Sequence, residues 1–220
     1  MASTWTIEKS AIVDAARRLA ELGLTSGSSG NISVRLRSQD GRELMAVTPK
    51  GMRYRGMTPD DIAVVDYELE PIEGERVPSS ESLMHVAIYR ARPYVNAVVH
   101  THAIHSSVFA VTGDEIPAVL DEVVVYLGGP IKVSEYGFPG TQELADNMVA
   151  ALGNRNAAII RNHGAVGVGK DIEDALDACI LTERVAQVVI YASMVGKVSP
   201  LPPDVVEREM AIFMMRQRSP

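Results

Sequence analysis

Two apolar segments of strand length each lead into a histidine, and this pattern constrains the fold more than any other feature of the chain. Residues 95–99 run directly into His100-Thr101-His102, and residues 157–160 run into Arg161-Asn162-His163. Successive side chains on a strand alternate between its two faces, so His100 and His102 are expected to point to the same face. α/β proteins tend to bind ligands at the ends of their strands. We therefore expect two strands that present imidazoles at their ends.

The three histidines His100, His102 and His163 form a candidate set of metal ligands. Two imidazoles on one strand face can share a metal ion, and a third can complete the set. Three neutral nitrogens leave a zinc ion open to water or substrate, which is the arrangement of a catalytic site. A lone His-x-His is more often an ordinary strand-end or turn feature, but the third histidine favours a metal. Zn²⁺ is the preferred ion, and Mn²⁺, Co²⁺ and Fe²⁺ use similar ligands.

Composition limits the classes of protein to which the chain can belong. Its 220 residues, 46% hydrophobic and 22% charged, fit one domain over residues 1–220 with a sizeable core. The net charge of −7 argues against a nucleic-acid surface but allows a local basic pocket for an anion. The single cysteine, Cys179, cannot form an intrachain disulfide, and we expect it in the core. Residues 1–18 contain no signal-like apolar segment, and no apolar run reaches about 18 residues, so we expect a cytoplasmic protein without a membrane partner.

Helical and strand-like patterns alternate along the chain, which predicts an α/β fold. Period-two patterns and short apolar runs predict strands over residues 32–37, 44–47, 62–66, 95–99, 157–160 and 165–168. Helical spacing predicts helices over residues 7–22, 81–91, 141–152, 172–195 and 204–215. Thr6 and Thr141 are placed to cap the first and third of these helices. Helix 172–195 is apolar around much of its surface, so we expect deep packing or a subunit contact.

Three polar segments are candidates for binding an anion. The first, Gly27-Ser28-Ser29-Gly30-Asn31, offers hydroxyls, amides and close backbone approach, or is a flexible loop. The second, Thr48-Pro49-Lys50-Gly51, offers a hydroxyl and a cation, or is a turn. In the third, Pro78-Ser79-Ser80-Glu81, two hydroxyls precede a carboxylate at a helix start, or Ser79 or Ser80 simply caps that helix. Turns and caps alone do not account for three such segments beside a candidate metal site.

The motifs Gly-x-x-Gly-Asn, Thr-Pro-x-Gly, Ser-Ser-Glu, His-Thr-His and Asn-His-Gly, in this order, resemble the class II aldolase/adducin-head family. The resemblance covers residues 7–195 and is closest to the L-fuculose-1-phosphate aldolase branch. It implies a single three-layer α/β/α domain with a largely antiparallel central sheet. It also implies a lyase that assembles as a homotetramer with its active sites at subunit interfaces.

The same resemblance assigns roles to the residues of the motifs. It implies that His100, His102 and His163 hold the metal and that Glu81 is the acid/base. It places the substrate phosphate among Ser28, Gly30, Asn31, Lys50, Gly51, Ser79 and Ser80. Cleavage of a ketose 1-phosphate then gives dihydroxyacetone phosphate and an aldehyde through a metal-stabilised enediolate, to which Asn31 donates a hydrogen bond. No lysine Schiff base is required, so Lys50 is a counter-charge for the phosphate.

Two departures from the family pattern concern the substrate and the proton donor. Relatives carry serine or threonine at the position of Lys50. The lysine either strengthens an anion site or indicates another substrate, such as a carboxylate. The aldolases carry a tyrosine shortly before a Gly-Gly pair, whereas this chain has Asp121-Glu122, with Tyr126 close to Gly128-Gly129. A second family tyrosine, in the C-terminal tail, has no counterpart after Tyr191. Glu122, Tyr126 or water is therefore expected to deliver the proton to the aldehyde oxygen.

Other functions remain open on the same scaffold. An epimerase is disfavoured because the epimerases of the family carry Asp in place of Glu81, whereas Lys50 keeps a dehydratase or a decarboxylase open. A non-catalytic adducin-like interaction module is least favoured, because that branch lacks the metal histidines. Of the other histidines, His105 is expected to orient a metal ligand or to cap a helix, and His85 to be packed or on the surface.

Overall fold

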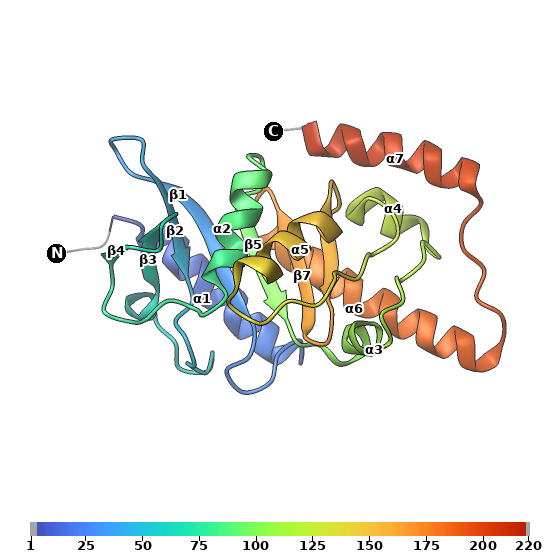
Figure 1. The fold of residues 1–220 in the computed structure, drawn as a ribbon, viewed down its shortest axis with the longest axis horizontal. Coiled ribbons are helices and arrows are strands. Elements are labelled where there is room, and N and C mark those ends of the chain that lie inside the picture. The colour runs from blue at the N-terminus through green and yellow to red at the C-terminus, as the bar shows by residue number, and fades with distance from the viewer. Residues whose placement is uncertain (1–3, 219–220) are drawn as a thin grey trace.

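The computed structural model describes residues 4–218, which form a mixed α/β structure around a seven-stranded sheet (Figure 1). The strand order is β4-β3-β2-β1-β5-β7-β6, and every pair of neighbouring strands is antiparallel. The strands are β1 (Asn31–Arg37), β2 (Glu43–Val47), β3 (Ala63–Asp66), β4 (Pro71–Glu73), β5 (Ala97–Thr101), β6 (Ala157–Ile160) and β7 (Gly164–Gly169). The antiparallel sheet that the resemblance implied is confirmed.

Helices cover both faces of this sheet and complete three layers (Figure 1). α1 and α6 pack on one face in a buried cluster that includes Ile32 and Val99. α2 and α5 pack on the other face, in a cluster that includes Val98 and Val166. α3 and α4 extend the first layer beside α6. The helices are α1 (Thr6–Glu21), α2 (Ser82–Ala91), α3 (Ile104–Thr112), α4 (Asp121–Leu127), α5 (Gln142–Leu152), α6 (Ile172–Val195) and α7 (Pro203–Arg218), with a short 3₁₀ helix, η1 (Pro59–Asp61).

The elements predicted from the sequence are all present, and the structure adds four that were not predicted. The added elements are β4, η1, α3 and α4, which have 3, 3, 9 and 7 residues. A periodic pattern needs more residues than these to stand out. The prediction that Thr6 caps the first helix is wrong, because Trp5 holds the N-cap position and Thr6 begins the helix. Thr141 does cap α5, since its hydroxyl accepts a hydrogen bond from Leu144 N at 3.3 Å.

Helix α6, with 24 residues, packs closely against the sheet. Its most apolar window has a mean hydropathy of 1.4, so by length and composition alone it could cross a membrane. A third of that window is buried in the structure, and Cys179 lies in the core as expected. A Cβ on Gly167 would lie 2.6 Å from the sulfur of Cys179, so the glycine allows the helix to approach β7. Leu176 and Cys179 of α6 therefore lie in the core, whereas Val188, Tyr191 and Val195 of the same helix are exposed.

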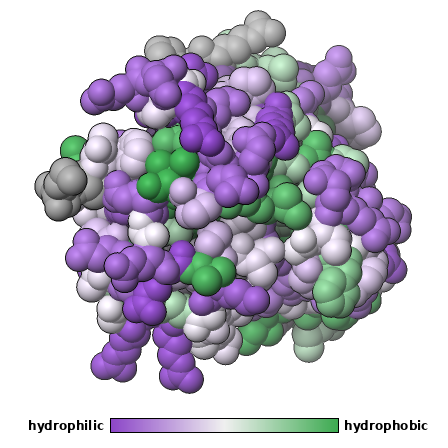
Figure 2. Space-filling view, turned by 60° about the vertical axis from the view of Figure 1, so that its left-hand side comes forward, coloured by the Kyte–Doolittle hydropathy of each residue, from purple (hydrophilic) through white to green (hydrophobic). Residues whose placement is uncertain are grey.

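Apolar side chains are exposed at several places on the molecule. The face shown in Figure 2 is mostly hydrophilic, with scattered hydrophobic areas. The helices α3 and α6 expose apolar residues at helical spacing: Ile104, Val108, Val111, Val188, Tyr191 and Val195. At the C-terminal end, α7 is anchored on α4 by Phe213, whose side chain is 1% exposed. The exposed faces of α3 and α6 are therefore available for contact with another molecule.

Candidate metal centre

Three histidines from neighbouring strands converge at one end of the sheet. His100 lies in β5 and His102 one residue beyond it, on the same face, as the strand alternation predicts. His163 lies in the turn between β6 and β7, and the pairing of β7 with β5 brings this turn beside His100. The ring centroids are 4.7 to 4.9 Å apart, and one nitrogen of each ring lies within 4.8 Å of the others. The predicted ligand set is therefore gathered in one place.

Local backbone geometry explains the Asn-His-Gly motif of the turn. Asn162 has φ 56°, a left-handed conformation that asparagine tolerates better than most residues. A Cβ on Gly164 would lie 2.2 Å from the carbonyl oxygen of Thr101 and 3.0 Å from His100 Cε1. A side chain at Gly164 would therefore force β5 away from β7 and displace the His100 ring.

Hydrogen bonding determines which nitrogen of His100 is free to bind a cation. Its Nδ1 lies 3.0 Å from the carbonyl oxygen of Ala165, which can only accept, so Nδ1 carries the proton. The lone pair is then on Nε2, which lies 2.9 Å from Nε2 of His102. Burial, together with the neighbouring imidazoles His100 and His163, lowers the pKa of His102 to about 3. The His102 ring is therefore held in the neutral form that binds metal.

Two buried polar atoms at this place make no hydrogen bond within the described part of the chain: His163 Nδ1 and Glu81 Oε1. Burial and the nearby His100 also lower the pKa of His163. Three imidazoles beside a partly unpaired carboxylate suit a divalent cation, and the all-nitrogen ligand set suits zinc. The residues present therefore fit the metal that the motifs predict.

Glu81 is the carboxylate nearest to the three imidazoles. Its Oε2 lies 3.2 Å from His100 Nε2, and its Oε1 lies 3.4 Å from His163 Nε2. Asn31, which is paired with His100 across β1 and β5, donates a hydrogen bond from Nδ2 to Glu81 Oε2 at 2.7 Å. Burial raises the pKa of Glu81, but the neighbouring His100 and His163 rings and the Asn31 hydrogen bond lower it by more, so its pKa lies below the ordinary value. Glu81 is therefore a carboxylate that Asn31 orients beside the three imidazoles.

The three polar segments lie next to one another beside Glu81. The second and third segments are joined by a backbone hydrogen bond from Ser79 N to Thr48 O at 3.1 Å. Thr48 Oγ1 accepts from Ile32 N at 3.1 Å, which joins the second segment to the strand that follows the first. Glu81, not a serine, holds the N-cap position of α2, and Ser79 Oγ accepts from Glu81 N at 3.3 Å. The alternative in which Ser79 or Ser80 caps the helix is therefore wrong.

The candidate anion ligands in these segments differ in accessibility. Gly30 has φ 78°, and a Cβ there would lie 2.6 Å from the His100 carbonyl oxygen, so only glycine fits. Asn31 and Ser79 are buried and Gly30 is half-buried, whereas the remaining members of the predicted set are exposed to solvent: Ser28, Lys50, Gly51 and Ser80. These exposed members supply hydroxyls and one cation at the solvent-facing rim of the three segments.

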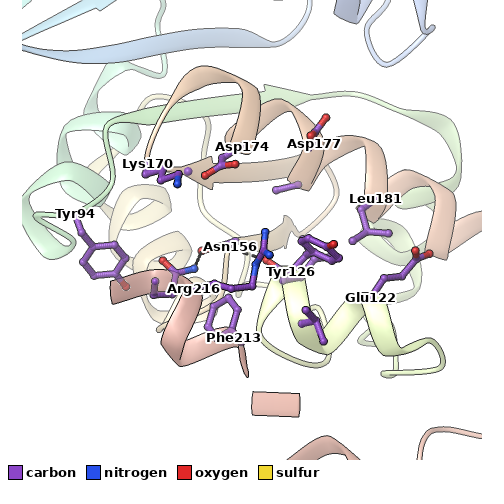
Figure 3. Close-up of a pocket in the computed structure, with 15 residues that line it drawn as sticks. Tyr94, Glu122, Tyr126, Asn156, Lys170, Asp174, Asp177, Leu181, Phe213 and Arg216 are labelled. Carbon is purple, nitrogen blue, oxygen red and sulfur yellow. Dashed lines mark hydrogen bonds between the residues drawn. The ribbon is translucent and has the colours of Figure 1, made fainter. Parts of the chain in front are cut away.

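Glu122 and Tyr126, the two expected proton donors, lie on α4 and line a different cavity (Figure 3). This cavity of about 540 Å³ lies between α4, α6 and α7. Glu122 forms an ion pair with Arg184 at 3.1 Å, and the Arg216 guanidinium lies 4.4 Å from the Tyr126 ring centroid. Within the described part of this single chain, neither side chain is placed in contact with the three histidines.

The two remaining histidines have different surroundings. His105 lies in the first turn of α3, and its Nδ1 lies 2.7 Å from Oε1 of Glu183. The Glu183 carboxylate also accepts the backbone N–H groups of His105 and Ser106, so Glu183 caps α3 and His105 supports that cap. His85 is fully buried, with Nε2 2.5 Å from Asn31 Oδ1. The sequence analysis missed this contact, although His85 lies one helical turn after Glu81.

Comparison with known proteins identifies the family. The sequence profile described as "Class II Aldolase and Adducin N-terminal domain" matches residues 10–190. The chain belongs to this family. It is 36% identical over 202 residues to the 5-methylthioribulose-1-phosphate/5-deoxyribulose-1-phosphate aldolase of Rhodospirillum rubrum, covering 92% of this chain and 89% of the relative.

Two further matches agree with this assignment. The 5-deoxy-D-ribulose 1-phosphate aldolase of Bacillus thuringiensis is 34% identical over 200 residues, which cover 91% of this chain and 92% of the relative. A solved structure of an L-fuculose 1-phosphate aldolase superposes with a TM-score of 0.88 at 32% identity, covering 97% of this chain and 98% of that one. The family and fold implied by the sequence motifs are confirmed.

Proposed function

We propose that the chain is a metal-dependent class II aldolase that cleaves or forms a carbon–carbon bond in a short ketose 1-phosphate. The observation that carries this proposal is the convergence of three imidazoles with one buried carboxylate that an amide orients. Relatives named as aldolases, 34 to 36% identical over about nine-tenths of the chain, support a lyase that acts on a sugar phosphate. The products of cleavage are dihydroxyacetone phosphate and a short aldehyde.

The cation belongs on the three imidazoles of His100, His102 and His163. Zinc is the ion that we propose, and Mn²⁺ and Co²⁺ use similar ligands. When bound, the cation supplies Lewis-acid stabilisation of the negative charge that bond cleavage leaves on the substrate. The hydrogen bond from His100 Nδ1 to Ala165 O keeps the ring turned with its lone pair toward the other two imidazoles.

Glu81 moves the proton at the reacting carbon. Its carboxylate removes this proton in the direction of synthesis, and its acid form returns it in the direction of cleavage. Asn31 has two amide hydrogens, and one of them donates to Glu81 Oε2. The second hydrogen is available to a substrate oxygen on which negative charge develops. Asn31 thus orients the base and stabilises charge at the same time.

The substrate phosphate binds at the rim formed by the three polar segments. The groups that we assign to it are Ser28, Gly30, Asn31, Lys50, Gly51, Ser79 and Ser80. Lys50 is the cation of this set, and its exposed position allows it to reach an entering anion. Binding of the phosphate here fixes the reacting carbon near Glu81, which lowers the entropic part of the barrier.

A second proton carrier is required at the aldehyde oxygen, and we assign this role to Glu122, Tyr126 or water. Because Glu122 and Tyr126 lie away from the histidines of their own chain, assignment to either of these side chains requires a site shared between subunits, as in a homotetramer. The apolar residues exposed on α3 and α6, such as Ile104 and Val195, supply a surface for this assembly. A cytoplasmic location is part of the same proposal.

The proposal is tested by a cleavage screen on metal-loaded protein. The substrates are 5-deoxyribulose 1-phosphate, 5-methylthioribulose 1-phosphate and L-fuculose 1-phosphate. Release of dihydroxyacetone phosphate is followed through NADH oxidation by a coupled glycerol-3-phosphate dehydrogenase. We expect wild type to release dihydroxyacetone phosphate from at least one substrate and His100→Ala to release none. The control is His105→Gln, which changes a histidine outside the cluster and should keep the bound metal. Substrate consumption without dihydroxyacetone phosphate would instead indicate a dehydratase or an epimerase and refute the aldolase.

A further inference from the structure

A continuous chain of buried polar side chains runs from Glu81 into the core between β1 and α2. Asn31 donates to Glu81 at 2.7 Å, and Asn31 Oδ1 lies 2.5 Å from His85 Nε2. On the far side of the ring, His85 Nδ1 lies 2.6 Å from Ser33 Oγ. Ser33 Oγ in turn lies 2.7 Å from the hydroxyl of Tyr89. All five side chains are at most 6% exposed, so solvent does not compete for these contacts.

Two local periodicities bring these residues face to face. Glu81, His85 and Tyr89 follow one another at intervals of four, which places them along one side of α2. Asn31 and Ser33 are two residues apart on β1, so they share the face of the sheet that α2 covers. The contacts therefore alternate between helix and strand, in the order Glu81, Asn31, His85, Ser33 and Tyr89, and lead away from the three metal-centre histidines.

The acceptor-only chemistry of the Glu81 carboxylate determines the direction of every hydrogen bond in this chain. An ionised carboxylate cannot donate, so the Asn31 amide nitrogen must face Glu81 and its oxygen must face His85. His85 Nε2 must then carry the proton, which leaves a lone pair on Nδ1. Ser33 must donate to that lone pair, and Ser33 Oγ then accepts from Tyr89.

With these directions, each hydrogen-bond donor in the chain has one acceptor. The opposite tautomer of His85 would remove the hydrogen bond between His85 and Asn31. With the proton on Nδ1, the Nε2 lone pair would face the lone pairs of Asn31 Oδ1. Asn31 would then have to rotate its amide, and its oxygen would face the Glu81 carboxylate. Burial, with a contribution from the neighbouring His100, lowers the pKa of His85 to about 3, so the neutral ring is the form in question at neutral pH.

We propose that His85, Ser33 and Tyr89 are positioning residues that hold the Asn31 amide, and through it the Glu81 carboxylate, in the orientation required for proton transfer. The proposal rests on the proposed role of Glu81 in catalysis. Their hydrogen bonds join these three side chains to one another and to Asn31, not to the three imidazoles of the metal centre, so each can be changed while the imidazole set remains. Because the chain is linear, the effect of a substitution decreases with its distance from Glu81.

The first experiment measures the tautomer of His85 without any substrate. The protein has five histidines, so a long-range ¹H–¹⁵N spectrum of ¹⁵N-histidine-labelled protein, assigned by His85→Gln, can identify each ring. We expect His85 to carry its proton on Nε2 in wild type and to lose this single tautomer in Ser33→Ala. A proton on Nδ1 in wild type would overturn the proposal, whether or not the chain proves to be an aldolase.

The second experiment compares kinetics across variants of the chain. His85→Leu leaves Asn31 Oδ1 without its donor, and we expect kcat to fall at least tenfold with KM and metal content little changed. His85→Gln, whose amide can donate to Asn31 and accept from Ser33, should recover kcat to within about threefold of wild type. Ser33→Ala should fall between these two variants, and Tyr89→Phe should have the smallest effect.

Ile88→Val is the matched control, since it destabilises the same helix without touching the polar chain. If His85→Leu lowers kcat no more than Ile88→Val, the role of His85 is structural only and the proposal fails. If no ketose phosphate is cleaved by the wild-type protein, the proposed function fails, and the tautomer spectrum alone decides the hydrogen-bond chain.

Discussion

Gly164 is the position where a single methyl group tests the geometry of the metal centre most directly. In Gly164→Ala the new Cβ would lie 2.2 Å from the Thr101 carbonyl oxygen and 3.0 Å from His100 Cε1. An ordinary carbon–oxygen contact is about 3.3 Å, so β5 and β7 must separate by roughly 1 Å. The φ of Gly164 is not in the left-handed region, so the cost is one of space and not of backbone conformation.

Two measurable effects follow from this displacement. Overpacking of a well-packed core costs about 1 to 3 kcal/mol, which in a protein of this size lowers Tm by about 2 to 12 °C. A metal site tolerates about 0.5 Å of movement, so moving His100 by roughly 1 Å should weaken zinc binding by at least about tenfold. Zinc affinity is measured by competition with a chromophoric chelator, and Tm by circular dichroism.

Gly196→Ala is the control for this substitution, because no heavy atom lies within 4 Å of a Cβ there and its φ of 179° is extended. We expect this variant to bind zinc and to melt as wild type does. If Gly164→Ala also binds zinc with wild-type affinity and melts with Gly196→Ala, then β5 and β7 are not as close as the structure places them. The assignment of His100 and His163 to one centre would then lose its geometric basis.

Four further substitutions address the other parts of the site. His100→Ala should abolish stoichiometric metal binding, measured by inductively coupled plasma mass spectrometry, and retained full activity would remove the metal mechanism. Glu81→Gln should keep the metal but lower kcat by roughly 10²- to 10⁴-fold, and an unchanged kcat would exclude Glu81 as the acid/base. Lys50→Ala should raise KM for a phosphorylated substrate roughly fivefold, and an unaltered KM would argue against the phosphate contact. The pKa of His85 falls to about 3 on folding, so the unfolded chain binds this proton at a higher pH than the folded chain does. The free energy of unfolding should therefore fall as pH drops from about 6.5 toward 3, by up to about 1.4 kcal/mol per pH unit. Urea titrations of His85→Gln should show a smaller dependence of this free energy on pH, and a dependence identical to that of wild type would show that His85 is not its cause.

Local patterns in the sequence predicted part of the histidine cluster. Strand alternation placed His100 and His102 on one face, and their Nε2 atoms lie 2.9 Å apart. Strand alternation also places Asn31 and Ser33 on one face of a strand, and helical spacing of four places Glu81, His85 and Tyr89 on one side of a helix. His85 was nevertheless expected only to be packed or on the surface, because no local pattern shows which strand a helix covers.

Short elements and long-range positions were harder to predict. β4, with three residues and a proline at its start, carries no usable alternation, and α3 and α4 are too short for a clear helical period. Glu122 and Tyr126 were expected as proton donors because of their place in the sequence before Gly128-Gly129. The structure places them in the cavity between α4, α6 and α7, and their part in catalysis remains a proposal that depends on a second subunit.

Local sequence patterns were enough to predict which residues share a strand face, where most of the helices begin and end, and which residue types are available as ligands. These properties depend on backbone geometry over a few neighbouring positions. The order of the strands in the sheet was not predicted: β7 lies beside β5, which brings His163 to His100, and β1 places Asn31 opposite His100. Strand order and helix packing depend on contacts between residues far apart in the chain, and the free energy of those contacts is not contained in any local pattern.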